Sequence, residues 1–128
     1  MKILIVDDKA SIRSAMRNIL ISLGFDNITE AVDGEEAWYK VNDEFRKDPA
    51  QAFELIVSDL EMPKMSGLEL LRAVRDDNNI KETPFIMATT VTAKQIILET
   101  MRLGVQAYII KPFDSQMVEL KLKQAGIL

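Results

Sequence analysis

The sequence predicts an α/β fold in which helices cover both faces of a parallel sheet. Five short apolar runs alternate strictly with segments whose hydrophobic residues recur at helical spacing, which is typical of βα units. The runs are mostly continuously apolar, as expected for strands that are buried on both faces. The 128 residues, 48% of them hydrophobic, suffice for one core, so we expect a single domain spanning residues 1–128.

The five strand candidates are apolar runs that each end at a polar residue. They are residues 3–6, 27–32, 53–57, 84–88 and 108–110. The second run is the weakest, because only Ile28, Ala31 and Val32 are apolar in it. The polar residues that follow parallel strands meet at the carboxyl edge of the sheet, which is where open α/β folds bind ligands.

Helices are predicted between the strands from spacing and from capping residues. The expected inward face of the first helix consists of Ile12, Met16, Ile19, Leu20 and Leu23. Three later helices begin with a small polar residue and have Glu or Gln three positions on: Asp33 with Glu36, Ser66 with Glu69, and Thr92 with Gln95. Asp114 is the expected cap of the last helix, which ends near Ala125, and Gly24 and Gly104 are expected helix ends.

Composition excludes several classes of function. The chain has no cysteine and no histidine, which excludes disulfides, zinc sites built from these residues and histidine-based catalytic triads. Its net charge of −4 offers no basic stripe for nucleic acid, and its apolar runs are too short to cross a membrane. No signal peptide is recognisable, so a cytoplasmic protein is expected. Residues 46–52 are expected to form a long surface loop, and the 7 methionines to fill the core.

Residues that can carry chemistry follow the strands at the predicted ligand edge. Asp7 and Asp8 follow the first strand, Asp59 the third, Thr89 the fourth and Lys111 the fifth. Three carboxylates at one edge repel one another unless a cation lies among them, and an all-oxygen ligand set favours Mg²⁺ or Mn²⁺. Lys111 and the Thr89 hydroxyl would supply positive charge and a donor to a transferring phosphoryl group. Asp59 is then the candidate nucleophile.

Several short motifs, taken together, resemble the response-regulator receiver family over about residues 2–125. They are Val6-Asp7-Asp8, Ser58-Asp59-Leu60-Glu61-Met62-Pro63, Gly67, Thr89 and Lys111-Pro112-Phe113. Each motif alone is weak, but five of them in this order are specific. Within the family, residues 23–25, 30–34 and 62–71 are most similar to the single-domain chemotaxis regulators of the CheY type.

The resemblance implies a flavodoxin-like (βα)5 doubly wound sandwich with the strand order 2-1-3-4-5. It also implies that Asp59 accepts a phosphoryl group from the phosphohistidine of a histidine kinase. Asp8 and Asp59 would bind Mg²⁺ directly, together with the backbone carbonyl of Glu61, and Asp7 would act largely through water. Lys111 would contact the phosphoryl group, and the family often has a cis peptide bond before the proline that follows this lysine.

The same resemblance implies a signalling output without enzymatic turnover beyond the domain's own phosphotransfer and dephosphorylation. Thr89 would move towards the phosphoryl group and Tyr108 would follow as an aromatic switch, which changes the surface of the fourth helix, fifth strand and fifth helix. The expected partners are a histidine kinase, a downstream protein such as the flagellar motor switch or another signalling protein, and a phosphatase. The chain itself is expected to be a monomer.

Three residues depart from the family pattern. Glu61 places a long acidic side chain two residues after the acceptor, Thr90 stands where the family usually has Ala or Gly, and Ser66 stands where many members have Asp. The Met1 start and the end at Leu128 favour a stand-alone domain without an output domain, and the alternative is a receiver cut from a longer regulator or hybrid kinase.

Two functions of other classes stay open at this point. A small phosphatase with an Asp nucleophile would need a second Asp where Glu61 stands, and turnover of a generic phosphate ester would reveal it. A flavodoxin-like carrier of FMN would need a phosphate-binding loop where Asp7-Asp8 stands, and two carboxylates there repel phosphate.

Overall fold

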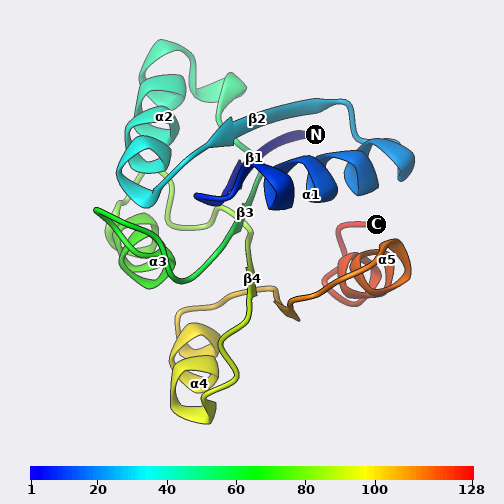
Figure 1. The fold of residues 1–128 in the computed structure, drawn as a ribbon. Coiled ribbons are helices and arrows are strands. Elements are labelled where there is room, and N and C mark those ends of the chain that lie inside the picture. Colours follow the sequence, from blue (N-terminus) through cyan, green and yellow to red (C-terminus); the bar gives the residue numbers. More distant parts are fainter.

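A computed structural model describes residues 1–128 as one sheet with helices on both faces (Figure 1). The strands are β1 (Lys2–Val6), β2 (Asn27–Ala31), β3 (Leu55–Ser58), β4 (Phe85–Thr89) and β5 (Ala107–Ile110). The helices are α1 (Ala10–Ser22), α2 (Gly34–Lys47), α3 (Gly67–Asp76), α4 (Lys94–Arg102) and α5 (Ser115–Gln124), with a 3-10 helix, η1 (Pro49–Gln51). All neighbouring strands are parallel in the order β2-β1-β3-β4-β5, which confirms the predicted fold. None of the helices combines the length and apolar character needed to span a membrane.

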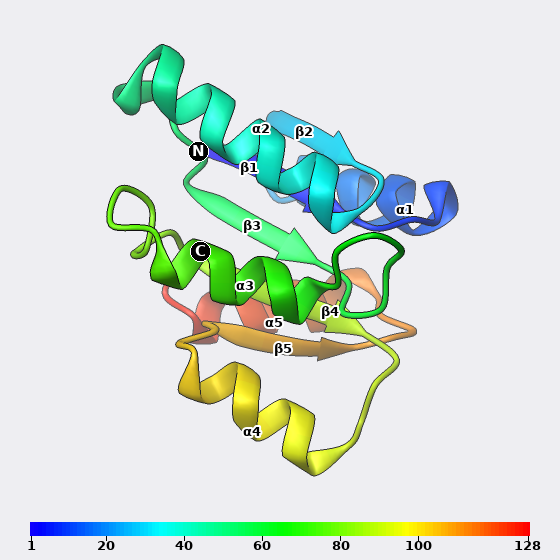
Figure 2. The same ribbon diagram turned by 90° about the vertical axis from the view of Figure 1, so that its left-hand side faces the viewer.

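The sheet separates two hydrophobic cores. Helices α1 and α5 cover one face, and Figure 2 shows α2, α3 and α4 side by side over the other. Successive residues of a strand point to opposite faces. In β1, Ile3 and Ile5 therefore belong to the core under α1 and α5, whereas Leu4 and Val6 belong to the core under α2 and α3. The three central strands, β1, β3 and β4, are buried on both faces and need unbroken apolar runs, which explains why these three strand predictions hold.

Side-chain caps begin three of the helices, as predicted. At the start of α3, Ser66 Oγ accepts from the Glu69 N–H at 3.1 Å, and Glu69 Oε1 accepts from the Ser66 N–H at 3.1 Å. At the start of α2, Asp33 Oδ1 accepts from the Glu36 N–H at 2.8 Å. Asp114 caps α5 in the same way. These local bonds satisfy amides that a helix leaves unpaired at its first turn.

The predicted cap of α4 is wrong. The residue that flanks the start of α4 is Ala93 rather than Thr92, and no side chain bonds an amide there. The preceding loop is held instead by a distant contact, because the Tyr108 hydroxyl donates to the Val91 carbonyl at 2.7 Å. A tertiary contact thus overrides the local capping pattern at this helix.

The prediction of a long loop over residues 46–52 is also wrong. Helix α2 continues to Lys47, which forms an ion pair of 3.0 Å with Asp43 one turn earlier. Asp48 then caps η1, and Lys2 Nζ on β1 donates to the Gln51 carbonyl at 2.9 Å. The segment is therefore ordered by a helical ion pair, a cap and a contact with the first strand.

The methionines fill the core only in part. Met16 and Met87 are fully buried, one in each core. Met101 on α4 and Met117 on α5 are 60% and 41% exposed, so the prediction fails for these two. They lie on the outward sides of their helices, where no other element covers them.

Replacing Ser66 by Ala should lower the free energy of unfolding by about 1 kcal/mol, because the first turn of α3 loses its cap. The matched control is Thr92→Ala, which removes a hydroxyl from an exposed residue that caps nothing and should change stability by less than about 0.5 kcal/mol. Urea unfolding followed by the fluorescence of Trp38 measures both. Equal losses in the two variants would contradict this assignment of the caps.

Candidate functional site

Three carboxylates meet at the carboxyl edge of the sheet. Strands β1 and β3 are neighbours with Val6 opposite Ser58, so the residues that follow them come side by side. Carboxylate oxygens of Asp7, Asp8 and Asp59 all lie within 4.8 Å of one another. Asp7 and Asp59 are 2% and 5% exposed, whereas Asp8 faces solvent. The acidic cluster expected from the sequence is therefore present.

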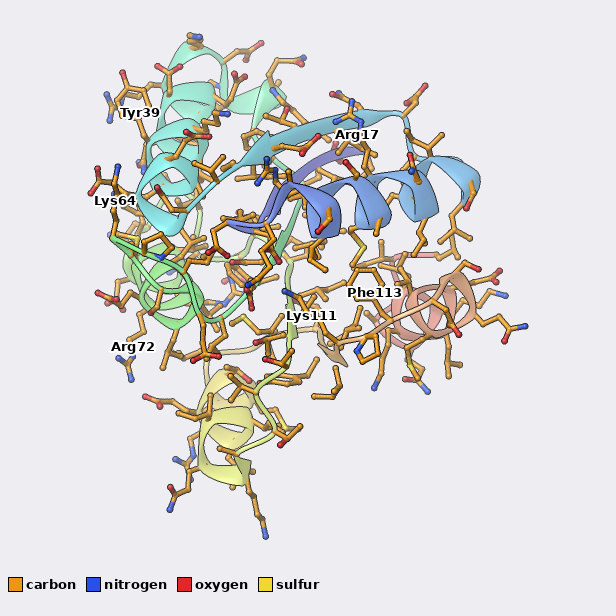
Figure 3. All side chains as sticks on the ribbon, in the orientation of Figure 1. Arg17, Tyr39, Lys64, Arg72, Lys111 and Phe113 are labelled. Carbon is orange, nitrogen blue, oxygen red and sulfur yellow. The ribbon has the colours of Figure 1, made fainter.

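Lys111 enters this cluster from the loop after β5. Its Nζ donates to Asp7 Oδ2 at 2.7 Å and lies 3.2 Å from Asp59 Oδ2, and Figure 3 shows the side chain pointing from its loop towards the ends of β1 and β3. The side chain is 8% exposed, and the peptide bond to Pro112 is cis, as expected. The ammonium group of Lys9 lies 3.9 Å from Asp8 Oδ1 and is largely exposed. Two ammonium groups face three carboxylates, so the cluster retains excess negative charge.

Backbone amides hold the remaining oxygens of the two buried carboxylates. Asp59 Oδ1 accepts from the Leu60 N–H at 2.7 Å, and Asp7 Oδ1 accepts from the Lys9 N–H at 2.9 Å. Each buried carboxylate is thus fixed by an amide at one oxygen and by Lys111 at the other. An oxygen-only ligand set with excess negative charge fits a hard divalent cation such as Mg²⁺ or Mn²⁺ and offers zinc no preferred nitrogen or sulfur ligand.

Asp59 borders a cavity of about 340 Å³. The other residues that line it are Lys9, Ile12, Glu61, Thr90, Lys111 and Pro112. Two of the departures from the family pattern, Glu61 and Thr90, are thus placed beside the site, and both are exposed. Neither Asp7 nor Asp8 lines this cavity. Of the three clustered carboxylates, Asp59 is therefore the one that lines this cavity, whereas Asp8 faces solvent outside it.

Gly67 packs the loop after β3 against the backbone of Asp59. Its N–H donates to the Leu60 carbonyl at 2.8 Å. A Cβ atom at this position would come within 2.0 Å of the Asp59 carbonyl oxygen, far inside van der Waals contact. Any side chain here would displace the backbone that carries Asp59, which gives a physical reason for this motif glycine.

Thr89 and Tyr108 are linked through the backbone of Val91. Thr89 is fully buried at the end of β4, and its Oγ1 accepts from the Val91 N–H at 3.3 Å. The Tyr108 hydroxyl donates to the carbonyl of the same residue at 2.7 Å. Sequence reasoning paired Thr89 with Tyr108 but missed Val91, because a residue that acts only through its backbone leaves no signal in the sequence.

Arg13 is a second residue that sequence reasoning missed. Its Nη1 donates to the backbone carbonyl of Asp7 at 2.7 Å, and its Nε donates to Glu30 at 2.9 Å. Arg13 thereby braces the turn that carries Asp7 and Asp8 against the end of β2. The available signal was a basic residue in the first turn of the helix after Asp7-Asp8, together with an acidic residue near the end of the neighbouring strand.

The charge of the acidic edge extends to Tyr108. Burial raises the pKa of its phenol above the ordinary value of about 10, and the negative charges of Asp59 and Glu61 raise it further. Because the pKa is higher in the folded than in the unfolded chain, the resulting stability is fully present below about pH 10. It is lost as the pH rises through the pKa of the folded protein.

A Tyr39→Phe variant leaves Tyr108 as the only tyrosine, so ultraviolet absorbance can follow its ionisation alone. Tyr108 should ionise at higher pH in the folded protein than in the same chain unfolded in urea. Adding Asp59→Asn should lower its pKa, because one of the charges that raise it is removed. Ionisation at the same pH in folded and unfolded chains would contradict this account.

Comparison with known proteins gives the sequence family. The response regulator receiver domain matches residues 3–123. Chemotaxis protein CheY1 of Helicobacter pylori strain J99 is 39% identical over 123 residues, which cover 96% of this chain and 94% of that protein. Chemotaxis protein CheY of Pseudomonas aeruginosa is 39% identical over 124 residues, which cover 97% and 94%.

Solved structures agree with these relatives. Chemotaxis response regulator CheY4 of Vibrio cholerae has a TM-score of 0.82 at 33% identity and covers 97% of each chain. A response regulator receiver protein from Pseudomonas putida has a TM-score of 0.80 at 29% identity and covers 95% of this chain and 94% of its own. Strand order, family match and relatives agree over nearly the whole length, and the chain belongs to the response regulator receiver family.

Proposed function

We propose that this receiver domain is a phosphorylation-activated switch of a two-component system and that Asp59 is its phosphoacceptor. The observation that carries the proposal is the position of Asp59, which alone among the clustered carboxylates borders the 340 Å³ cavity. Its two oxygens are held by the Leu60 amide and by Lys111, so the carboxylate is oriented before a reactant arrives.

The proposed donor is the phosphohistidine of a histidine kinase. A carboxylate oxygen of Asp59 forms the new P–O bond while the P–N bond of the donor breaks, and the electron pair leaves with the kinase imidazole. Lys111 Nζ, which lies 3.2 Å from Asp59 in this structure, would stabilise the negative oxygens of the phosphoryl group. No residue of this chain needs to gain or lose a proton in that exchange.

The proposed cofactor is Mg²⁺, for which Mn²⁺ can substitute. Asp8 and Asp59 would bind it directly with the backbone carbonyl of Glu61, and Asp7 would act through water. When bound, the ion supplies positive charge that neutralises phosphoryl oxygens. The oxygen-only ligand set and the excess negative charge around Lys111 support this assignment.

The proposed switch is the set of contacts at Val91. A phosphoryl group at Asp59 replaces the single negative charge of the carboxylate by about two charges on the phosphoryl oxygens, which are also new hydrogen-bond acceptors. The buried Thr89 hydroxyl is a donor that can turn to it, and this movement would disturb the Thr89 contact to the Val91 amide. Since Tyr108 bonds the carbonyl of Val91, both contacts would change together in the loop that leads into α4.

The proposed output is the α4-β5-α5 surface, which we define by its exposed apolar side chains. These are Leu98, Met101, Ile110, Met117 and Leu120, which are 39% to 60% exposed. A downstream protein would bind there, and the named chemotaxis relatives favour the flagellar motor switch or another chemotaxis protein as that partner. A phosphatase that ends the signal is a further proposed partner.

Asp59→Asn should abolish phosphorylation by a small acyl phosphate in the presence of Mg²⁺, because the nucleophilic carboxylate is lost. Intact mass spectrometry should detect one added phosphoryl group on the wild type and none on the variant. The matched control is Asp114→Asn, which changes the same residue type at the cap of α5, where Asn serves as well as Asp. Labelling of the Asp59→Asn variant at the wild-type level would refute the assignment.

Thr89→Ala should leave phosphorylation largely intact while uncoupling Tyr108, since it removes the hydroxyl between the acceptor and Val91. With Mg²⁺ and beryllofluoride, the NMR signals of the Tyr108 ring should shift in the wild type and stay nearly unchanged in the variant. Thr90→Ala is the matched control, because Thr90 is exposed and does not bond Val91. A full shift of the Tyr108 ring in Thr89→Ala would show that the signal takes another route.

A further inference from the structure

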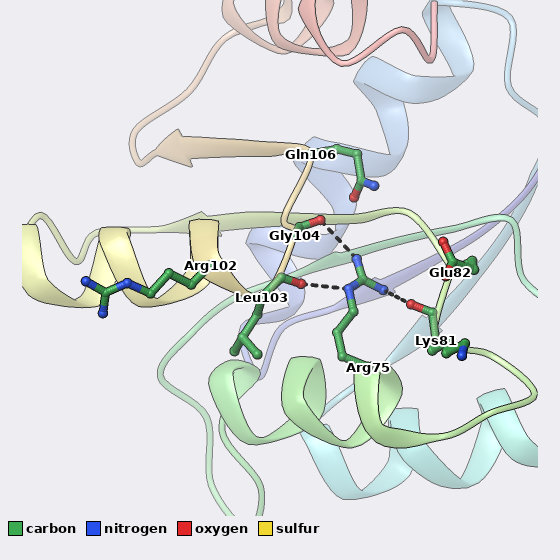
Figure 4. Close-up of a pocket in the computed structure, with 7 residues that line it drawn as sticks. All are labelled: Arg75, Lys81, Glu82, Arg102, Leu103, Gly104 and Gln106. Atoms are coloured by element: carbon green, nitrogen blue, oxygen red, sulfur yellow. Dashed lines mark hydrogen bonds between the residues drawn. The ribbon is translucent and has the colours of Figure 1, made fainter.

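A second cavity of about 340 Å³ lies at the opposite, amino-terminal edge of β4 and β5 (Figure 4). It is bordered by Arg75 on α3, by Lys81 and Glu82 before β4, by Arg102 at the end of α4, and by Gln106 before β5. Three basic residues and one acidic residue suggest an anion site at first sight. The hydrogen bonds of Arg75, however, give this residue a different role.

The Arg75 guanidinium is already occupied by backbone carbonyls. Its Nε donates to Leu103 at 2.7 Å and its Nη2 donates to Gly104 at 3.1 Å. Its Nη1 donates to the carbonyls of Lys81 and Thr83 at 2.9 and 2.7 Å. Four of its five N–H groups are therefore used, and too few remain to bind an anion.

These bonds join three segments of the chain through one side chain. Arg75 belongs to the last turn of α3, Leu103 and Gly104 end α4, and Lys81 and Thr83 precede β4. Burial lowers the pKa of the guanidinium and the charge of Glu82 opposes this shift. The group remains protonated at neutral pH, so all four bonds are charge-assisted.

Helix α4 has few other attachments to the domain. Thr100 is its one fully buried residue, no side chain caps its start, and its one ion pair, Arg72 with Glu99, also comes from α3. The loop before its amino end is tied to Thr89 and Tyr108 through Val91. The carboxyl end is tied to Arg75. Figures 1 and 2 show α4 as the last helix of its row, with only α3 beside it.

We propose that Arg75 is a positioning residue that fixes the carboxyl end of α4, so that a change at Thr89 and Tyr108 reorients the helix instead of loosening it. The inference rests on the proposed function, because it assigns Arg75 to the coupling between Asp59 and the α4-β5-α5 surface. Without this anchor, movement of the loop before α4 would leave the helix free to adopt many orientations, and no single output surface would form.

Hydrogen exchange of Arg75→Ala tests the anchor. Arg72→Ala is the comparison on the same helix, because it removes only a partly exposed ion pair with Glu99 of α4. Exchange at the last turn of α4 should become about tenfold faster in Arg75→Ala, as loss of a charge-assisted hydrogen bond predicts, while β1 and β3 stay protected. Millimolar guanidinium ion, but not the same concentration of sodium ion, should restore slow exchange in Arg75→Ala. A uniform rise over all elements, or a rise of the same size in Arg72→Ala, would overturn the anchor.

Beryllofluoride with Mg²⁺ tests the coupling, because it probes a response that a merely structural arginine would not alter. In the wild type, exchange should change both in residues 90–93 and in the carboxyl half of α4. In Arg75→Ala the change should remain in residues 90–93 and fail to reach the end of α4. An identical response in both proteins would refute the role of Arg75 in the coupling. The absence of any response in the wild type would refute the proposed function, and the anchor would then be judged by hydrogen exchange with and without guanidinium ion.

Discussion

The excess negative charge of Asp7, Asp8 and Asp59 is the constraint around which this edge of the molecule is built. Parallel pairing of β1 with β3 places the three carboxylates together, and like charges at such distances cost free energy. Lys111 follows β5, which is separated from β3 by β4 alone, and its ammonium group offsets part of this cost. The same clustering that opposes folding creates an affinity for a divalent cation, so stability and ligand binding are linked at this edge.

The site and the proposed output surface are connected mainly by backbone atoms. Val91 presents its N–H to Thr89 and its carbonyl to Tyr108, and the carbonyls of Leu103 and Gly104 accept from an arginine at the other end of α4. Side chains on the sheet and on α3 therefore hold a helix that buries little of itself. This weak burial agrees with the proposed reorientation of α4 as a unit.

Features determined by near neighbours could be predicted from the sequence, and those determined by distant contacts could not. The apolar run of β1 and the Ser66–Glu69 cap follow from adjacent residues, and the carboxyl-edge cluster follows from the topology. The start of α4 was mispredicted because Tyr108 holds the preceding loop. The segment after α2 was mispredicted because it contacts Lys2, far away in the chain. The bonds of Arg75 could not be predicted, because any residue type can present the backbone carbonyls that accept them.

The alternation of side chains along the central strands divides the molecule into two separate environments. In β4, Ile86 and Ala88 lie under α1 and α5, while Phe85 and Met87 lie on the face that α2, α3 and α4 cover. A substitution at Ile86 would thus affect the core on the side remote from α4, whereas one at Met87 would affect the core beneath the helix that we propose to move. Neighbouring residues of one strand can therefore evolve under different pressures. Those under α1 and α5 affect the stability of the fold, and those beneath α4 also affect the proposed response to phosphorylation.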